Sequence, residues 1–366
     1  MKSGLYKGPW EYDAPGPVMA KCAIQLDNMN IRNEAKLLTP NQVRAQYPLS
    51  TKAAQTVQIG RETIQKIMDG EDKRLFVVVG PCSIHDEHEA YEYARRLKKL
   101  SDQYSDKLYF AMRVYLEKPR TRTGWGGLME DPSLVGQSNF DEGALVGRRV
   151  LFNISEIGLP IATEILDPVT PQYISDLISY GAIGARTTEN PQHRKMVSGL
   201  SFPVGMKNGT GGSVAIAIDG MATAREPHTF RGINLDGQLS ALTTSGNRYT
   251  QLILRGSTQG INYDVDSVQD AKLELEKNGL PVSIMIDCSH GNSGKDHTKQ
   301  RVALAYALEH IGKDYPVSAV MLESNLEEGK QAIAAPEELK KGQSVTDGCI
   351  GFKETEELLE ETYISL

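Results

Sequence analysis

Positively charged side chains follow several short apolar runs of this sequence, at or just beyond the point where each run ends. They are Arg113, Lys118, Arg120, Arg186, Lys207 and Arg255. If they meet in one place they repel one another unless anions bind, because a charge taken from water without a partner costs free energy. Arg holds phosphate or carboxylate through paired hydrogen bonds, and Lys holds it as a point charge. The pattern therefore predicts a site for phosphate and carboxylate groups, although each cation taken singly could be a salt-bridged surface residue.

A second set has the side chain types that bind transition metals. It consists of Cys82, His290, Glu323 and Asp347. A thiolate with an imidazole and carboxylates suits Mn, Fe, Co or Zn better than Mg or Ca, because hard cations avoid sulfur. The spacing alone leaves simpler interpretations open, since a buried Cys often only fills apolar space and Asp347 beside Gly348 is typical of a turn. A divalent metal site is therefore a hypothesis at this point.

Eight short apolar runs would have to position these side chains. They cover residues 75–79, 109–112, 160–163, 182–185, 204–206, 252–254, 284–287 and 319–322. Buried parallel strands read as continuous apolar stretches, and each run is followed by a plausible helix. The sequence thus predicts an α/β fold of the (β/α)8 TIM barrel type, whose active site forms at the C-terminal ends of the strands.

Two segments exceed what a barrel needs. Residues 1–70 are predicted to be an N-terminal extension for oligomerisation or regulation, irregular over 1 to about 25 and helical over 50 to 69, and residues 71–366 the catalytic barrel. The stretch between Lys207 and Arg255 is too long for one β/α step. Its turn signals predict an inserted β-hairpin near 227–246, a candidate regulatory or interface element.

Composition narrows the class of protein. The chain has 366 residues and a net charge of −7, which argues against general nucleic-acid binding. It has no run of about 18 apolar residues to span a membrane, and residues 1–20 lack the apolar core of a secretory signal. Four cysteines in so long a chain are interpreted as thiols. We therefore expect a cytoplasmic enzyme that binds neither nucleic acid nor membranes.

Several motifs, in order along the chain, resemble those of one enzyme family. They are Gly80-Pro81-Cys82-Ser83-Ile84-His85-Asp86, Met112-Arg113-Val114-Tyr115, Glu117-Lys118-Pro119-Arg120-Thr121, Gly184-Ala185-Arg186-Thr187-Thr188-Glu189, Lys207-Asn208-Gly209-Thr210, Ile253-Leu254-Arg255-Gly256, Asp287-Cys288-Ser289-His290 and Ser344-Val345-Thr346-Asp347. The sequence resembles type I 3-deoxy-D-arabino-heptulosonate 7-phosphate (DAHP) synthase from about residue 27 to the C-terminus. The resemblance implies a metal-dependent transferase that condenses phosphoenolpyruvate with D-erythrose 4-phosphate and water and releases phosphate, the first step of the shikimate pathway to chorismate and the aromatic amino acids.

The resemblance also implies roles for individual residues. The phosphoenolpyruvate ligands would be Arg113, Lys118, Arg186, Lys207 and Arg255. The erythrose 4-phosphate motif would be Lys118, Pro119, Arg120 and Thr121, with Glu164 and Ala185 as further substrate contacts. The metal ligands would be Cys82, His290, Glu323 and Asp347, and the catalytic residues Lys118, Cys82 and His290. We expect Lys118 to protonate the alkoxide formed in the reaction, because neighbouring cations can lower the pKa of an ammonium group.

Members of this family are inhibited by an aromatic amino acid. The corresponding positions here are Asp27, Asn28, Gln172, Ser201, Phe230 and Gly232. Asn28 and Gly232 stand where some regulated members have Asp and Ser, and a lost carboxylate weakens binding of an amino group. The alternative is a desensitised or differently regulated paralogue in a secondary pathway.

Two other functions compete with this interpretation. The related 3-deoxy-D-manno-octulosonate 8-phosphate synthase takes arabinose 5-phosphate, but that family has a different motif where this chain has Lys118-Pro119-Arg120-Thr121. A non-catalytic barrel that binds an aromatic metabolite or a protein would show damage to the catalytic set, and none is visible.

The family and the long N-terminal extension favour a homodimer or homotetramer.

Overall fold

The computed structural model of the protein describes residues 26–120 and 124–366. Of the predicted site residues, Thr121 lies outside the described residues, and so does the predicted irregular stretch over 1–25. The described chain divides into two units, of which the first includes residues 26–37 and the second is residues 38–366. The described part of the first unit, residues 26–37, contains neither helix nor strand, and has a turn in which the Ile31 amide donates to the Asn28 carbonyl over 3.0 Å.

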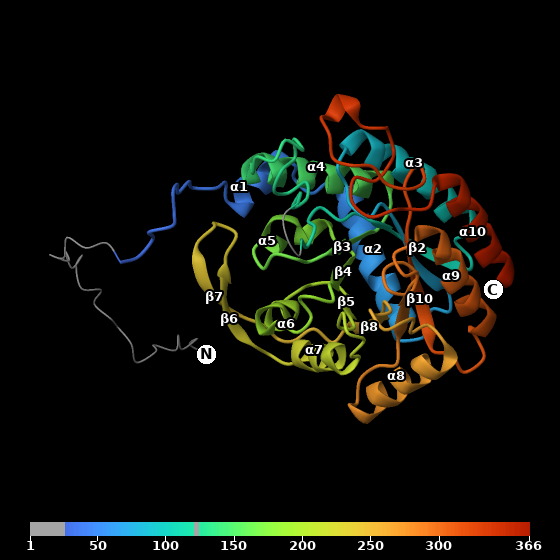
Figure 1. The fold of residues 1–366 in the computed structure, drawn as a ribbon. Helices are drawn as coiled ribbons and strands as arrows, with labels where there is room; N and C mark the ends of the chain where they lie inside the picture. The colour runs from blue at the N-terminus through green and yellow to red at the C-terminus, as the bar shows by residue number, and fades with distance from the viewer. Residues whose placement is uncertain (1–25, 121–123) are drawn as a thin grey trace. The chain divides into compact units, whose positions relative to one another are not determined.

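Eight parallel strands of the second unit close into a barrel, as predicted (Figure 1). In spatial order they are β1 (Leu75–Gly80), β2 (Leu108–Arg113), β3 (Ile161–Glu164), β4 (Tyr180–Ile183), β5 (Val204–Lys207), β8 (Thr250–Leu254), β9 (Ile284–Asp287) and β10 (Val317–Glu323). β10 closes the barrel against β1, with Gly80 opposite Glu323. Because all strands run the same way, their C-terminal residues meet at one end of the barrel.

Alternate residues of each strand face two different cores. In β1, Val77 and Val79 pack in the large cluster between strands and helices. Phe76 and Val78 belong to a smaller cluster inside the barrel. Successive side chains of a strand point to opposite faces, and both faces are buried here, so the strands read as unbroken apolar runs.

Helices surround the barrel (Figure 1). They are α1 (Pro40–Gln46), α2 (Thr51–Met68), α3 (Glu87–Gln103), α4 (Phe140–Ile157), α5 (Pro171–Ile174), α6 (Pro191–Val197), α7 (Ala215–Arg225), α8 (Val265–Lys277), α9 (Gln300–His310) and α10 (Phe352–Ser365), with 3-10 turns η1 (Ser175–Leu177), η2 (His297–Lys299) and η3 (Pro336–Glu338). Several begin at a side chain that accepts a hydrogen bond from the first turn, such as Asp86 before α3 and Asp264 before α8. Among the described residues, no helix is long and apolar enough to cross a membrane.

The predicted N-terminal helix is α2, and it belongs to the same compact unit as the barrel. Its N-cap is Ser50, whose Oγ accepts from the Ala53 amide over 3.0 Å, and it is followed by Gly70 in the left-handed conformation. Ile64 and Ile67 of α2 pack in the same cluster as Phe76 inside the barrel. α2 therefore closes the end of the barrel where the strands begin, opposite the predicted site.

The predicted inserted hairpin is also present. β6 (Thr229–Ile233) pairs antiparallel with β7 (Leu239–Thr243), between α7 and β8 (Figure 1). Its turn is held by Asn234, which exchanges backbone and side-chain hydrogen bonds with Gln238, and Gly237 supplies the positive φ that the turn requires. The hairpin pairs with no strand of the barrel.

Candidate active site

A cavity of about 280 Å3 lies where the barrel strands end. Its lining consists of Lys118, Pro119, Arg120, Glu164, Gly184, Ala185, Arg186, Thr187, Lys207, Thr210, Arg255, His290, Lys295 and Asp347. The topology explains why these residues meet. Glu164 and Lys207 are the last residues of β3 and β5, and Arg255 directly follows β8. Cation side chains far apart in the sequence thus surround one small cavity.

Three of the predicted substrate and metal residues that the structure describes are not in the lining of this cavity. They are Arg113, Cys82 and Glu323, and all three are buried. Each buried residue nevertheless contacts another member of the predicted set. Glu323 Oε1 lies 2.7 Å from Arg113 Nη2 and 3.7 Å from His290 Nε2, and Cys82 Sγ lies 3.0 Å from Lys118 Nζ.

Arg113 is held in a fully buried position at the end of β2. Its guanidinium group pairs with Glu323, donates to the carbonyl of Pro81 over 3.1 Å, and lies 3.5 Å from the centre of the Tyr115 ring. Burial alone would raise the pKa of Glu323, but the charges of Arg113, His290 and Lys118 outweigh it and hold the pKa below its usual value. Glu323 is therefore ionised although it is buried.

Lys118 sits among negative groups as well as cations. Its Nζ lies 3.0 Å from Cys82 Sγ and 4.0 Å from Asp347 Oδ2. Burial lowers the pKa of Lys118, but Cys82 and Glu323 together overcome burial and the charge of Arg113, so that the pKa lies above its usual value. This direction is opposite to the lowered pKa expected from the neighbouring cations, because that expectation left out Cys82 and Glu323.

The four predicted metal ligands lie next to one another in two pairs. Cys82 Sγ is 3.6 Å from Asp347 Oδ2, and His290 Nε2 is 3.7 Å from Glu323 Oε1. Among the described residues, no three His, Cys, Asp or Glu side chains are arranged closely enough to form a metal site. The donor types still fit a transition metal. Burial and the charge of Glu323 raise the pKa of the Cys82 thiol, and a bound divalent cation would offset both effects.

Sequence reasoning missed Asp287, the last residue of β9. This fully buried carboxylate lies 3.0 Å from Lys207 Nζ and 2.9 Å from His290 Nδ1. The available signal was an acidic residue ending an apolar run, in the same position as the predicted site residues Glu164 and Glu323. Four cavity-lining residues were also missed, namely Gly184, Thr187, Thr210 and Lys295.

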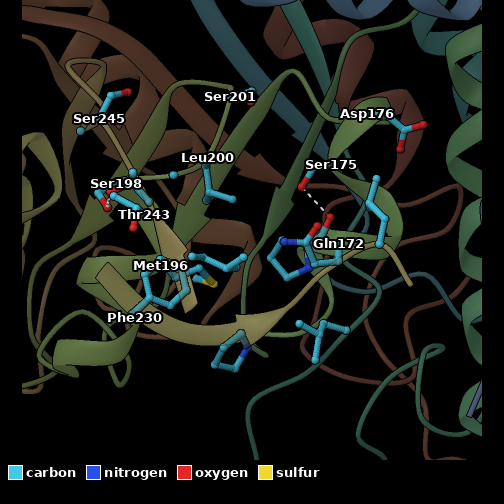
Figure 2. A pocket seen from close by; sticks show the side chains of 18 of the residues that line it. Gln172, Ser175, Asp176, Met196, Ser198, Leu200, Ser201, Phe230, Thr243 and Ser245 are labelled. Carbon is cyan, nitrogen blue, oxygen red and sulfur yellow. Dashed lines mark hydrogen bonds between the residues drawn. The ribbon is translucent and has the colours of Figure 1, made fainter. Parts of the chain in front are cut away.

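A second cavity, of about 720 Å3, opens between the hairpin and the helices next to it (Figure 2). Its lining consists of Arg44, Arg61, Pro168, Pro171, Gln172, Ser175, Asp176, Met196, Ser198, Gly199, Leu200, Ser201, Phe230, Ile233, Leu235, Leu242, Thr243, Thr244, Ser245 and Gly246. Figure 2 shows the apolar side chains of Met196, Leu200 and Phe230 around it, with Gln172 and Asp176 from the region of α5 and η1.

This second cavity contains three residues of the predicted inhibitor set, Gln172, Ser201 and Phe230. Gly232 lies nearby on β6, and a Cβ atom there would come within 2.8 Å of Leu242 Cδ1, so Leu242 fills the space that a side chain at 232 would need. Asp27 and Asn28 belong to the other compact unit and are not placed relative to this cavity.

Comparison with known proteins gives consistent matches over nearly the whole chain. The model of the DAHP synthetase I family matches residues 46–360. The Tyr-sensitive phospho-2-dehydro-3-deoxyheptonate aldolase of Escherichia coli (strain K12) is 47% identical over 343 residues, covering 93% of this chain and 96% of the relative. The Phe-sensitive enzyme of the same organism is 45% identical over 338 residues, covering 92% and 96%. The solved structure of phospho-2-dehydro-3-deoxyheptonate aldolase from Francisella tularensis SCHU S4 superposes with a TM-score of 0.90 at 42% identity, covering 92% of this chain and 98% of that one.

Proposed function

The chain belongs to the DAHP synthetase I family and carries out the first step of aromatic amino acid biosynthesis, and we propose that it does so in the cavity at the strand ends. The reaction condenses phosphoenolpyruvate with D-erythrose 4-phosphate and water to give 3-deoxy-D-arabino-heptulosonate 7-phosphate and phosphate. The convergence of six cationic side chains on one cavity is the observation that supports this assignment. They are Lys118, Arg120, Arg186, Lys207, Arg255 and Lys295.

These cations suit two anionic substrates. Phosphoenolpyruvate carries a phosphate and a carboxylate, and Arg186, Lys207 and Arg255 around the cavity supply the donors to hold both. Arg120 is exposed while Lys118 is buried, so the erythrose 4-phosphate motif runs from the inside of the site to its surface. We infer that the phosphate of the sugar binds near Arg120 and its aldehyde lies deeper, toward Lys118.

The chemistry requires C3 of phosphoenolpyruvate to attack the aldehyde carbon, water to add at C2, and phosphate to leave. Lys118 is the proposed proton donor to the aldehyde oxygen as it becomes an alkoxide. The raised pKa of Lys118 keeps it protonated at neutral pH, and an alkoxide is a far stronger base than an amine, so the ammonium group can still transfer its proton. Arg113 is not in the lining of the cavity, and its pairing with Glu323 would connect it to the proposed metal donors behind the site.

We further propose that Cys82, His290, Glu323 and Asp347 hold a divalent transition metal, either Mn, Fe, Co or Zn. Such a metal supplies a Lewis acid that polarises the aldehyde. The support is the donor set itself, two carboxylates, a thiol and an imidazole at one edge of the substrate cavity.

The second cavity is the proposed site for an aromatic amino acid that inhibits the enzyme. Relatives are named as sensitive to Tyr, Phe or Trp. Phe230 and Leu200 offer apolar contacts for a ring, and Gln172 and Ser201 offer polar groups. From the sequence we also propose roles for Asp27 and Asn28 in inhibitor binding, assembly as a homodimer or homotetramer, and a cytoplasmic location.

The direct test follows phosphoenolpyruvate consumption by the purified protein with erythrose 4-phosphate or with arabinose 5-phosphate. Each sugar is assayed before and after metal removal and after readdition of Mn2+. We expect turnover with erythrose 4-phosphate alone, lost on metal removal and restored by Mn2+. Turnover with arabinose 5-phosphate would instead support the octulosonate 8-phosphate alternative, and turnover that survives complete metal removal would contradict the metal proposal.

A further inference from the structure

One carboxylate oxygen connects the proposed phosphoenolpyruvate site with the proposed metal site. Asp287 Oδ2 lies 3.0 Å from the Lys207 ammonium and 2.9 Å from His290 Nδ1. The other oxygen, Oδ1, accepts from the backbone amide of Ser289 over 3.1 Å and from its hydroxyl over 2.7 Å. Asp287 is completely buried. Among the described residues its Oδ2 has no hydrogen-bond partner and is held by the charge contacts with Lys207 and His290, whereas Oδ1 is hydrogen-bonded to Ser289.

The backbone around Asp287 is fixed as well. Asn292 Nδ2 donates to the Asp287 carbonyl over 2.9 Å and to the Leu254 carbonyl over 3.1 Å, which ties the end of β9 to the end of β8. These backbone hydrogen bonds restrict the position of the Asp287 carboxylate, so that Lys207 and His290 are positioned by it.

The contact determines which nitrogen of His290 is available. Nδ1 lies 2.9 Å from the Asp287 carboxylate and 2.7 Å from the Ser289 hydroxyl, so in the neutral form of His290 the proton is favoured on Nδ1. Nε2, 3.7 Å from Glu323 Oε1, is then the nitrogen left for a metal. Carboxylates commonly orient metal-binding histidines in this way. His290 also has φ 54°, a left-handed conformation that a non-glycine residue keeps only when its surroundings hold it.

The same contact orients Lys207. Its side chain is buried and its ammonium group lines the substrate cavity. The ion pair with Asp287 holds the ammonium group in place, and its N–H donors remain available for a phosphate or carboxylate in the cavity. A buried ammonium without this partner would be costly and free to turn away from the cavity.

We propose that Asp287 is a positioning residue that holds Lys207 for substrate and His290 for metal on one shared oxygen, so that the two sites are kept in a fixed relation. This inference rests on the proposed roles of Lys207 and His290. It predicts that a single change at Asp287 weakens binding of both ligands, each measured without the other and without turnover.

The test uses Asp287→Asn, which keeps the size of the side chain but removes its charge. Co2+ is titrated into the metal-free protein and followed by its visible absorption, and phosphoenolpyruvate is titrated into the metal-free protein by calorimetry. We expect Co2+ affinity to fall 10- to 100-fold, as for loss of a partner that orients a metal ligand, and phosphoenolpyruvate affinity to fall at least tenfold. The matched control is Asp296→Asn in the following loop, where the carboxylate contacts the nearby residues Thr298 and Lys299. Neither affinity should change by more than about twofold.

A second variant keeps the test decisive if Asp287→Asn does not fold. Ser289→Ala removes the hydroxyl that braces Oδ1 and lies 2.7 Å from His290 Nδ1, but leaves the Lys207 ion pair. It should lower Co2+ affinity several-fold and leave phosphoenolpyruvate binding within about twofold. Loss of only one affinity in a folded Asp287→Asn protein, or no effect of Ser289→Ala on Co2+, would overturn the positioning role. If unmodified protein bound neither ligand, the proposed function would fail instead.

Discussion

The ammonium group of Lys118 lies 3.0 Å from the thiol of Cys82, with Asp347 Oδ2 next to both. The proposed proton donor and two proposed metal ligands thus form one contact group, although they come from three separate parts of the chain. The ammonium group therefore lies between the cavity on one side and the proposed metal donors on the other.

Lys118→Ala is expected to lower turnover by about 100- to 10,000-fold, the range for loss of a positioned acid. Affinities for Co2+ and phosphoenolpyruvate should stay much closer to those of the unmodified protein, because the metal donors and the other cations of the cavity remain. Single-turnover kinetics together with binding titrations would measure both. Unchanged turnover would contradict the proton-donor role, and recovery of turnover in Lys118→Arg, which does not release its proton at neutral pH, would do so as well.

Arg186→Ala should weaken phosphoenolpyruvate binding at least tenfold. A lost hydrogen bond to a charged group costs about 1.5–3 kcal/mol, and tenfold corresponds to about 1.4 kcal/mol. Calorimetric titration of phosphoenolpyruvate measures the loss directly, and KM for erythrose 4-phosphate should change less. Arg186→Lys keeps the charge but not the paired donors, so it should recover only part of the affinity. An equal loss for both substrates would mean that Arg186 supports the cavity as a whole.

Most of the cavity could be predicted from the sequence because of the parallel topology. Once each apolar run is a barrel strand, residues such as Lys207 and Arg255 must meet at one end, whatever the details of packing. Partners across the barrel were not predictable. The sequence does not show that Asp287 reaches Lys207, which lies two strands away in the order β5-β8-β9, or that Cys82 and Glu323 outweigh Arg113 in setting the pKa of Lys118.

The stability of the protein should depend on Glu117, the residue before Lys118. Thr170 donates to Glu117 Oε1 over 2.9 Å, and Oε2 is buried without a hydrogen-bond partner among the described residues. Burial, with the charge of Asp167, raises the pKa of Glu117 to about 7. The folded protein therefore keeps a proton that the unfolded chain releases near pH 4 to 5, and the contribution of Glu117 to folding stability falls as pH rises from about 4.5 to 7.

Glu117→Gln should remove this dependence while keeping an acceptor for Thr170. Between pH 4.5 and pH 8, the unfolding free energy of the unmodified protein should fall by up to about 3 kcal/mol relative to that of the variant. Each unit of pKa shift corresponds to about 1.4 kcal/mol. Urea unfolding at several pH values measures the difference. Glu130→Gln, which changes an exposed carboxylate, is the control, and its stability relative to the unmodified protein should show no comparable dependence on pH. A constant difference between Glu117→Gln and the unmodified protein across this range would mean that Glu117 does not titrate there.

The second cavity gives a prediction for inhibition. If an aromatic amino acid binds there, Phe230→Ala should weaken its binding about tenfold or more, because an aromatic pair adds about 0.5–1.5 kcal/mol to the burial of the ring itself. Titrations with Phe, Tyr and Trp, each monitored by calorimetry and by inhibition, would measure the loss and identify the preferred ligand. Activity without inhibitor should remain, because Phe230 does not line the substrate cavity.

Leu239→Ala provides a control on the same hairpin. Leu239 is 78% exposed and lies outside the lining of either cavity, so its loss should leave inhibition unchanged. Equal effects of the two variants would point to the hairpin as a whole rather than to contact between Phe230 and the ligand. Absence of binding by all three amino acids to the unmodified protein would instead support the desensitised alternative. In that case Gly232 is the next position to change, together with Leu242→Ala, because Leu242 occupies the space that a side chain at 232 would need.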